Sequence, residues 1–322
     1  MAWLPEREIS GPERPTVRDV EPLNRVFSEA FTDRYRRDGM TGVRVPYLNP
    51  AIWRYALDDA GDGAMVWRDP DGELCGFNMV HLSGREGWMG PLAVRPDRQG
   101  SGLGKTMIRA GITWLRERGA RTIGLETMPR TIENIGFYSR LGFVPGHLTV
   151  TLTRDLQRRP LLHPEVLSTS GAARADRLAE CRRLTAELLP ETDFTRELNA
   201  TADLRIGDTL MVRDPGGELS GFALYHTAPL AAGRSQDEVR ILKLVARHLE
   251  AFDRLLVATE AAALALDIRR LSLRCQTAQS EAYLRLVRQG FRTHWTDLRM
   301  TLATHPEQRL AEGAVVFSNW EI

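Results

Sequence analysis

Three glycines within five residues form the part of this chain best suited to chemistry. Gly100, Gly102 and Gly104 lie between a short apolar run at residues 92–94 and an amphipathic helical pattern that starts at Leu103. Glycine lets backbone N–H groups approach an anion closely, and the first turn of a helix leaves N–H groups unpaired at the positive end of its dipole. A strand, a glycine loop and a helix in this order predict a phosphate-binding site.

The spacing of the glycines excludes two common nucleotide loops. A Walker loop needs GxxxxGK[ST], and although Lys105 and Thr106 follow Gly104, that glycine comes only four residues after Gly100. A Rossmann fingerprint needs GxGxxG, which this stretch also lacks. The alternative to a ligand site is a flexible turn before a helix.

The full string from Val94 to Gly104 reads Val-x-Pro-x-x-Gln-Gly-x-Gly-x-Gly, and it resembles the pyrophosphate loop of the GNAT N-acetyltransferase superfamily. The resemblance implies that acetyl-CoA is the cosubstrate, with its pyrophosphate on the loop and its pantetheine arm along the preceding strand. It assigns cofactor contacts to Leu92, Ala93, Val94, Gln99, Gly100, Ser101, Gly102, Leu103, Gly104, Lys105 and Thr106.

A second stretch, residues 134–143, resembles the later helix of the same family, which carries an aromatic-Tyr pair and ends in Gly-Phe. The resemblance extends over about residues 14–154 and adds Asn134, Phe137 and Tyr138 to the expected cofactor contacts. The family usually has an asparagine seven residues before the tyrosine, where it contacts the pantetheine. This chain has Thr131 there, so that contact is not carried over.

Composition is that of an ordinary globular protein long enough for two domains. The chain has 322 residues, 43% hydrophobic and 26% charged, with a net charge of +1, which gives no electrostatic case for nucleic acid or an anionic membrane. Its three cysteines, Cys75, Cys181 and Cys275, are scattered and fit reduced thiols, and no motif predicts a metal. Without a signal peptide or a membrane-spanning apolar run, we expect a cytoplasmic protein.

Periodicity and turn residues predict an alternation of strands and helices. We expect an arm at residues 1–13, a strand at 16–18 and a helix from Asp19 to about Phe31. The later helices are expected at 51–57, 103–117 and 132–141, and the later strands at 64–67, 74–81, 88–94, 122–127 and 148–153.

The chain repeats itself. Residues 66–77 match residues 211–222 with an offset of 213 − 68 = 145, and the Arg-Leu-Gly-Phe at 140–143 matches residues 288–291 with an offset of 291 − 143 = 148. Two similar offsets in the same order predict a duplicated domain. We expect domains at 1–156 and 165–322.

The second copy differs where chemistry is expected. Residues 247–254 contain no glycine, and Glu250 and Asp253 would repel a pyrophosphate. Leu286 stands at the position of Tyr138. This copy is therefore expected to keep the fold without the reaction, either shaping the acceptor cleft of the first domain or serving as a packing partner.

The expected fold class is α/β, with two GNAT-like domains, each a mixed, mostly antiparallel twisted sheet with helices on both faces. The resemblance also implies that the sheet splays at the carboxyl end of the loop strand, with the cofactor in the gap. Backbone N–H groups of residues 92–94 would then stabilise the oxyanion.

Two side chains are the candidates for proton transfer. Tyr138 is the candidate acid, because a phenol with an ordinary pKa of about 10 stays protonated at neutral pH; the alternative is a core aromatic, as we expect for Phe137. Glu126, at the end of its strand, is the candidate base, ahead of Glu86, Glu29 and His81. An amine that loses its proton to bulk water needs no base at all.

We therefore expect acetyl-CoA-dependent N-acetylation of a small amine or exposed amino group by direct transfer, in a monomer or homodimer. Mycothiol synthases are also tandem GNAT proteins, which makes a cysteinyl-sugar amine one candidate acceptor on architecture alone. The competing hypothesis is a non-catalytic acyl-CoA-binding sensor or regulatory protein, which would bind the cofactor without turnover.

Overall fold

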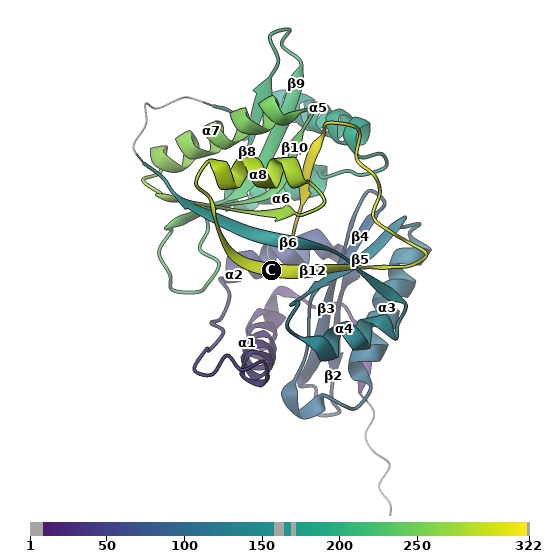
Figure 1. Cartoon of the computed structure of the whole chain (residues 1–322). Coiled ribbons are helices and arrows are strands. Elements are labelled where there is room, and N and C mark those ends of the chain that lie inside the picture. The colour runs from purple at the N-terminus through teal and green to yellow at the C-terminus, as the bar shows by residue number, and fades with distance from the viewer. Residues whose placement is uncertain (1–8, 158–163, 169–171, 321–322) are drawn as a thin grey trace, which may run out of the picture.

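One twisted sheet runs through both halves of the chain (Figure 1). The computed structural model describes residues 9–157, 164–168 and 172–320. Within them the sheet has 13 strands in the order β1-β2-β3-β4-β5-β12-β6-β11-β10-β9-β8-β7, with β13 paired to β10. Neighbouring strands are antiparallel except for two parallel pairs, β4 with β5 and β10 with β11.

Both halves use the same order of elements, which confirms the predicted fold class. The first half contains β1 (Ser10–Glu13), α1 (Val20–Arg37), α2 (Pro50–Ala60), β2 (Ala64–Arg68), β3 (Leu74–Ser83), β4 (Glu86–Val94), α3 (Leu103–Glu117), β5 (Thr122–Thr127), α4 (Ile132–Ser139) and β6 (Phe143–Asp155). The second contains β7 (Glu165–Val166), α5 (Ala172–Leu188), α6 (Thr195–Leu204), β8 (Gly207–Arg213), β9 (Leu219–His226), β10 (Glu238–Ala246), α7 (Leu249–Ala265), β11 (Arg270–Gln276), α8 (Ser280–Arg288), β12 (Arg292–Leu302) and β13 (Val315–Ser318).

The sequence was misread near the N-terminus. The segment expected as a strand at 16–18 is instead the start of a 3-10 helix, Val17–Asp19, because Thr16 and Asp19 form a reciprocal capping box. Asp19 therefore caps this turn and gives no side-chain cap to α1, which continues to Arg37. Part of the expected arm forms β1 and pairs with β2.

The two halves exchange strands in the middle of the sheet, where β6 and β12 cross between them (Figure 1). β12, the late strand of the second half, lies between β5 and β6 of the first half. β6 in turn lies between β12 and β11. Each half thus completes the sheet of the other. The expected domain bounds, 1–156 and 165–322, stay a prediction, and they do not separate two sheets.

Helices cover both faces of the sheet in each half. In the first half, α3 and α4 pack on one face with a core that includes Met107, Ile108 and Tyr138, while α1 and α2 cover the other face through residues such as Leu23 and Trp53. In the second half α7 and α8 pack on one face, and α5 and α6 on the other.

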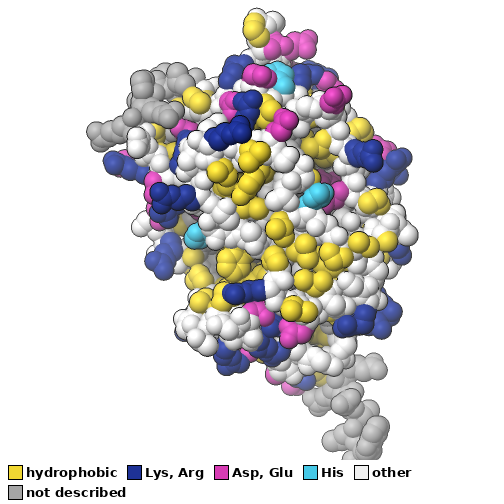
Figure 2. Space-filling view, viewed as in Figure 1, with side chains coloured by type: hydrophobic (Ala, Val, Ile, Leu, Met, Phe, Trp, Pro, Cys, Tyr) yellow, Lys and Arg dark blue, Asp and Glu magenta, His cyan; other side chains and the backbone are white. Residues whose placement is uncertain are grey.

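The outer surface mixes charges of both signs. On the face in Figure 2, Lys and Arg side chains alternate with Asp and Glu around the edge, and hydrophobic side chains gather over the middle. Among the described residues, no helix is long and apolar enough to cross a membrane, and no cluster of three or more His, Cys, Asp or Glu side chains could hold a metal ion. The three cysteines are free and buried.

Candidate active site

The first parallel strand pair opens halfway along its length. Glu86–Met89 of β4 pairs with Thr122–Leu125 of β5, and the pairing between these two strands ends there. Beyond this point Leu92 and Ala93 pair only with β3, while Glu126 of β5 pairs with β12. Among the residues that the structure describes, the edge of residues 92–94 that faces away from β3 therefore has no strand partner, as the family resemblance implies for a pantetheine gap.

A bulge bends β4 at the opening. The β3–β4 register shifts between Asn78 and Val80, so that Gly90 and Pro91 of β4 oppose a single β3 residue. Such an extra residue bends the strand locally and interrupts the ladder. The bulge sets the angle at which β4 leaves β5.

His81 holds this bulge. Its Nδ1 lies 2.6 Å from Oδ2 of Asp59, and its Nε2 lies 2.9 Å from the carbonyl oxygen of Gly90. Both ring nitrogens face acceptors, and Asp59 also accepts from Arg196 at 2.9 Å. Burial alone would raise the pKa of Asp59, but the charges of His81 and Arg196 outweigh it and hold that pKa below its ordinary value. His81 is thus placed to position the strand, with both ring nitrogens in contact with groups of the chain itself.

The glycine loop follows β4 and ends at the start of α3. Gly100 and Gly102 have φ of 82° and 90°, a region that favours glycine. A Cβ at either position would meet no atom within 4 Å, so the space beside the loop is open to a ligand. Gly102 is the N-cap of α3 and has no side chain to satisfy the first-turn N–H groups, which leaves them for an anion.

The remaining loop side chains stay close to the backbone or point to solvent. Ser101 Oγ donates to the Arg98 carbonyl at 2.7 Å, and Gln99 Nε2 donates to the Val94 carbonyl at 3.2 Å. Lys105 and Thr106 are exposed on the first turn of α3. These contacts brace the loop, and a lysine beside a phosphate site adds positive charge.

Helix α4 borders the same opening. A Cβ on Gly104 would lie 3.7 Å from the Phe137 ring, an ordinary van der Waals contact, so the start of α3 packs directly beside α4. Asn134 Nδ2 donates to Thr127 Oγ1 at 3.4 Å, at the end of β5. Thr131, which replaces the usual asparagine, donates instead to Asp38 Oδ2 at 2.6 Å and so ties α4 to the end of α1.

Tyr138 packs in the core with its hydroxyl as the polar end. Its ring lies 5.2 Å from that of Phe137 and 6.1 Å from that of Phe143. Burial raises the pKa of Tyr138 to about 12. No side-chain hydrogen bond engages this hydroxyl in the part of the chain that the structure describes, so the phenol is protonated at neutral pH and available as a donor.

Glu126 is bound by two arginines from the other half of the chain. Its carboxylate accepts from Arg274 at 2.6 Å, Arg299 at 2.9 Å and Thr149 at 2.6 Å. Burial alone would raise the pKa of Glu126, but the two guanidiniums hold it below its ordinary value. These contacts favour a structural anion over a base. Sequence reasoning missed Arg274 and Arg299 because only the strand exchange brings them to β5.

The other candidate bases are placed differently. Glu29 is exposed on α1. Glu86 is buried at the closed end of the β4–β5 pair, where its Oε2 accepts from Ser318 Oγ at 2.9 Å. Burial raises the pKa of Glu86. Neither carboxylate lies on the open stretch of β4.

The second parallel pair opens in the same way, but its gap is filled. β10 and β11 pair over Glu238–Ile241 and Arg270–Leu273. A bulge follows, and Lys243–Ala246 then pairs with β13 near the end of the chain. The backbone edge that is open in β4 is thus hydrogen-bonded in β10 by the chain's own strand. Sequence patterns did not show this.

The start of α7 replaces the glycine loop in the second half. His248 is its N-cap, and Nδ1 of that side chain accepts from the Ala251 backbone N–H at 3.2 Å. Ala251 and Phe252 are fully buried. The cap already satisfies the Ala251 N–H, a first-turn donor that a pyrophosphate would otherwise use.

Comparisons with known proteins agree with this geometry. Residues 24–143 match the family model described as the acetyltransferase (GNAT) family. A mycothiol acetyltransferase from Kytococcus sedentarius is 30% identical over 158 residues, 44% of this chain and 52% of that relative. The chain thus spans about half the length of the curated relatives it matches.

Two solved structures share the fold over nearly the whole chain. A tandem GNAT protein from the clavulanic acid biosynthesis pathway has a TM-score of 0.60 at 14% identity, covering 94% of this chain and 100% of that chain. A GCN5-related N-acetyltransferase from Sphaerobacter thermophilus has a TM-score of 0.57 at 16% identity, covering 96% and 99%. Two successive strand-loop-helix units on one sheet define the class as a double GNAT fold. Residues 24–143 are therefore similar to the acetyltransferase (GNAT) family in sequence, and the chain as a whole shares the GNAT fold.

Glu126→Gln should lower the free energy of unfolding by about 3–5 kcal/mol, because it leaves Arg274 and the buried Arg299 without their shared anion. Urea denaturation at pH 7 measures this. Since the folded-state pKa of Glu126 is lowered, its contribution is complete above the ordinary carboxyl pKa of about 4.3 and is lost as pH falls below it. The difference in free energy of unfolding between the variant and the wild type should therefore disappear at acid pH.

The matched control is Glu133→Gln, since Glu133 is 75% exposed in its ion pair with Arg34 and should change stability little. Unchanged stability of Glu126→Gln together with a large loss of turnover would contradict the structural role and restore Glu126 as the base.

Proposed function

We propose that the chain transfers the acetyl group of acetyl-CoA directly to the amine of a small molecule. The observation that carries this proposal is the open edge of residues 92–94 followed by an uncapped helix start at Gly102. An extended pantetheine arm pairs with such an edge, and a pyrophosphate suits such a helix start. The family match supports the same cosubstrate.

The amine attacks the thioester carbonyl, and a tetrahedral oxyanion forms. Backbone N–H groups of residues 92–94 would donate to it, an effect worth about 3–4 kcal/mol per preorganised donor. The carbon–sulfur bond then breaks, the CoA sulfur leaves with the electron pair, and the nitrogen loses its proton to give an amide and free thiol.

Tyr138 would donate to the leaving sulfur. Its pKa of about 12 exceeds that of an ordinary thiol, about 8.5, so complete proton transfer is uphill by about 5 kcal/mol. Tyr138 therefore acts mainly by a hydrogen bond to the developing thiolate, and the final proton comes from the amine or water. No side chain is assigned as base, because Glu126 and His81 are both held by partners.

The acceptor is proposed only as a class. The relatives that match the first half are named mycothiol acetyltransferases, which makes a cysteinyl-sugar amine one acceptor to test. Turnover is tested by incubating the chain with acetyl-CoA and pooled amines and measuring the free thiol that is released. Tight acetyl-CoA binding with no turnover on any amine would support the sensor hypothesis instead.

Gly102→Glu should abolish acetyl-CoA binding without unfolding the chain. The new side chain must adopt the φ of 90° and would place a carboxylate where pyrophosphate charge is expected. Loss of two backbone donors, at about 1–3 kcal/mol each, lowers the affinity steeply. Calorimetry measures the binding and circular dichroism the fold; a folded variant that keeps its affinity would rule out the pyrophosphate assignment.

Tyr138→Phe should lower kcat by roughly 10²- to 10³-fold, as expected for loss of one hydrogen-bond donor to a developing anion, with little change in cofactor affinity. Since the pKa of Tyr138 is about 12, its phenol should stay protonated up to about pH 10 and give no alkaline limb to the rate of the wild type. Phe143→Leu, a change in the same aromatic cluster, controls for packing. Activity of the Tyr138 variant within a few-fold of wild type would return the ring to a core role.

Each chain should bind one acetyl-CoA, in the first half only. Lys243–Ala246 is already paired with β13, and His248 already caps α7. Titration calorimetry on the intact chain should give a stoichiometry near one, and Gly102→Glu should remove all of it. A stoichiometry of two, or one site that survives in the variant, would mean that β13 leaves the second gap to admit a ligand.

A further inference from the structure

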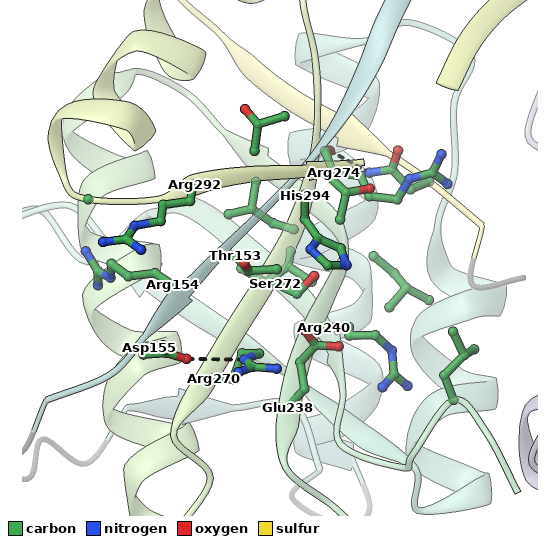
Figure 3. Close-up of a pocket in the computed structure, with 18 of the residues that line it drawn as sticks. Thr153, Arg154, Asp155, Glu238, Arg240, Arg270, Ser272, Arg274, Arg292 and His294 are labelled. Carbon is green, nitrogen blue, oxygen red and sulfur yellow. Dashed lines mark hydrogen bonds and ion pairs between the residues drawn. The ribbon is translucent and has the colours of Figure 1, made fainter. Parts of the chain in front are cut away.

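A hollow of about 790 Å³ lies over the central strands β6, β10, β11 and β12 (Figure 3). We call it the basic basin, because its lining includes Arg154, Arg240, Arg270, Arg274, Arg292 and His294. Side chains at every second position of a strand share one face, and Arg270, Ser272 and Arg274 follow this spacing on β11. The lining side chains therefore come from alternating positions on strands of both halves.

Arginines outnumber acidic residues in the lining, although Arg154 is paired with Glu260 beneath it. The acidic residues there are Asp155 and Glu238, against five arginines. Arg270 pairs with Asp155 at 3.2 Å, and Arg274 pairs with Glu126 and Asp297 at the far side. In the described residues, Arg292 has neither an ion pair nor a side-chain hydrogen bond, and it is exposed.

Neutral hydrogen-bonding groups complete the site. Thr153 and Ser272, which are paired on β6 and β11, belong to the lining. Figure 3 shows them near the middle with His294, while Arg292 and Arg154 lie toward one edge. Hydroxyl groups beside guanidiniums are the usual partners of carboxylate and phosphate oxygens.

The basin adjoins the β4–β5 opening by two routes. Arg274 lines the basin and contacts Glu126, which lies on β5 just past the last residue paired with β4. Trp320 lines the basin as well, and its ring lies 5.4 Å from that of Trp88 on β4. One layer of side chains thus separates the basin from the strands that flank the proposed thioester.

We propose that the basic basin binds an anionic group, a carboxylate or a phosphate ester, carried by the acceptor whose amine is acetylated. This inference rests on the proposed function and adds the substrate class. A volume of about 790 Å³ suits a small molecule, and arginine forks bind both oxygen-rich groups with two parallel hydrogen bonds. Arg292 lies seven residues before Arg299, the β12 partner of Glu126, which is roughly 20 Å along the strand at about 3.3 Å per residue. An acceptor with its anion on Arg292 and its amine toward β4 would therefore be an extended molecule of about that length.

Matched acceptor pairs test the charge requirement. The pairs are hexaglycine with its C-terminal amide, and hexaglycyl phosphoethanolamine with hexaglycyl ethanolamine, since six extended residues span about 20 Å. The anionic member of at least one pair should have the higher kcat/KM, and the preferred pair tells carboxylate from phosphate. Arg292→Gln should reduce that advantage by about tenfold, mainly through KM, as expected for one charge-assisted contact.

Arg288→Gln is the control, because Arg288 is exposed on α8, four residues earlier, and outside the basin lining. It should leave the anionic advantage intact. Equal kcat/KM within both pairs, or equal effects of the two variants, would overturn the basin proposal while transfer itself stands.

Binding without turnover separates the two proposals. Succinate and inorganic phosphate are titrated by calorimetry into chain saturated with CoA, so that the pyrophosphate loop is filled. Binding of either probe that weakens about tenfold in Arg292→Gln, but not in Arg288→Gln, supports the basin even if no amine is acetylated. Absence of binding for both probes contradicts the basin, whatever the enzyme assay shows.

Discussion

An unpaired backbone edge inside a sheet is the feature on which the rest of this structure depends. Backbone N–H and C=O groups that leave water need partners, so a parallel pair that separates halfway must be completed by something. At β10 the chain completes the edge itself, by pairing Lys243–Ala246 with β13. At β4, residues 92–94 pair with β3 on one edge, and no other described strand pairs with them. The same fold thus contains one filled gap and one open gap.

The strand exchange keeps the two halves in a fixed relation. β12 pairs with β5, and β6 pairs with β11, so neither half has a complete sheet alone. The exchange carries Arg274 and Arg299 to Glu126, one residue beyond the last β5 residue that pairs with β4. The second half therefore supplies two side chains beside the β4–β5 opening of the first. This arrangement explains how a copy without a glycine loop contributes to the proposed site.

Local patterns predicted the local elements well. The glycine loop, the helix Leu103–Glu117 and the strand Thr122–Thr127 were all read from spacing, because their signals lie within a few residues. The sequence could not show which strands of the two copies pair, since pairing between distant segments leaves no local pattern. For this reason it suggested Glu126 as a base and did not reveal that β13 fills the second gap.

Hydrogen–deuterium exchange with and without acetyl-CoA tests most directly whether one gap is open and the other filled. The account predicts that residues 92–94 and 100–106 become protected when acetyl-CoA binds, because the ligand covers their free N–H groups. Lys243–Ala246 should be protected in both states, because β13 already pairs with it. The account would be contradicted if Lys243–Ala246 became protected only when acetyl-CoA is present. It would also be contradicted if acetyl-CoA did not protect residues 92–94 and 100–106.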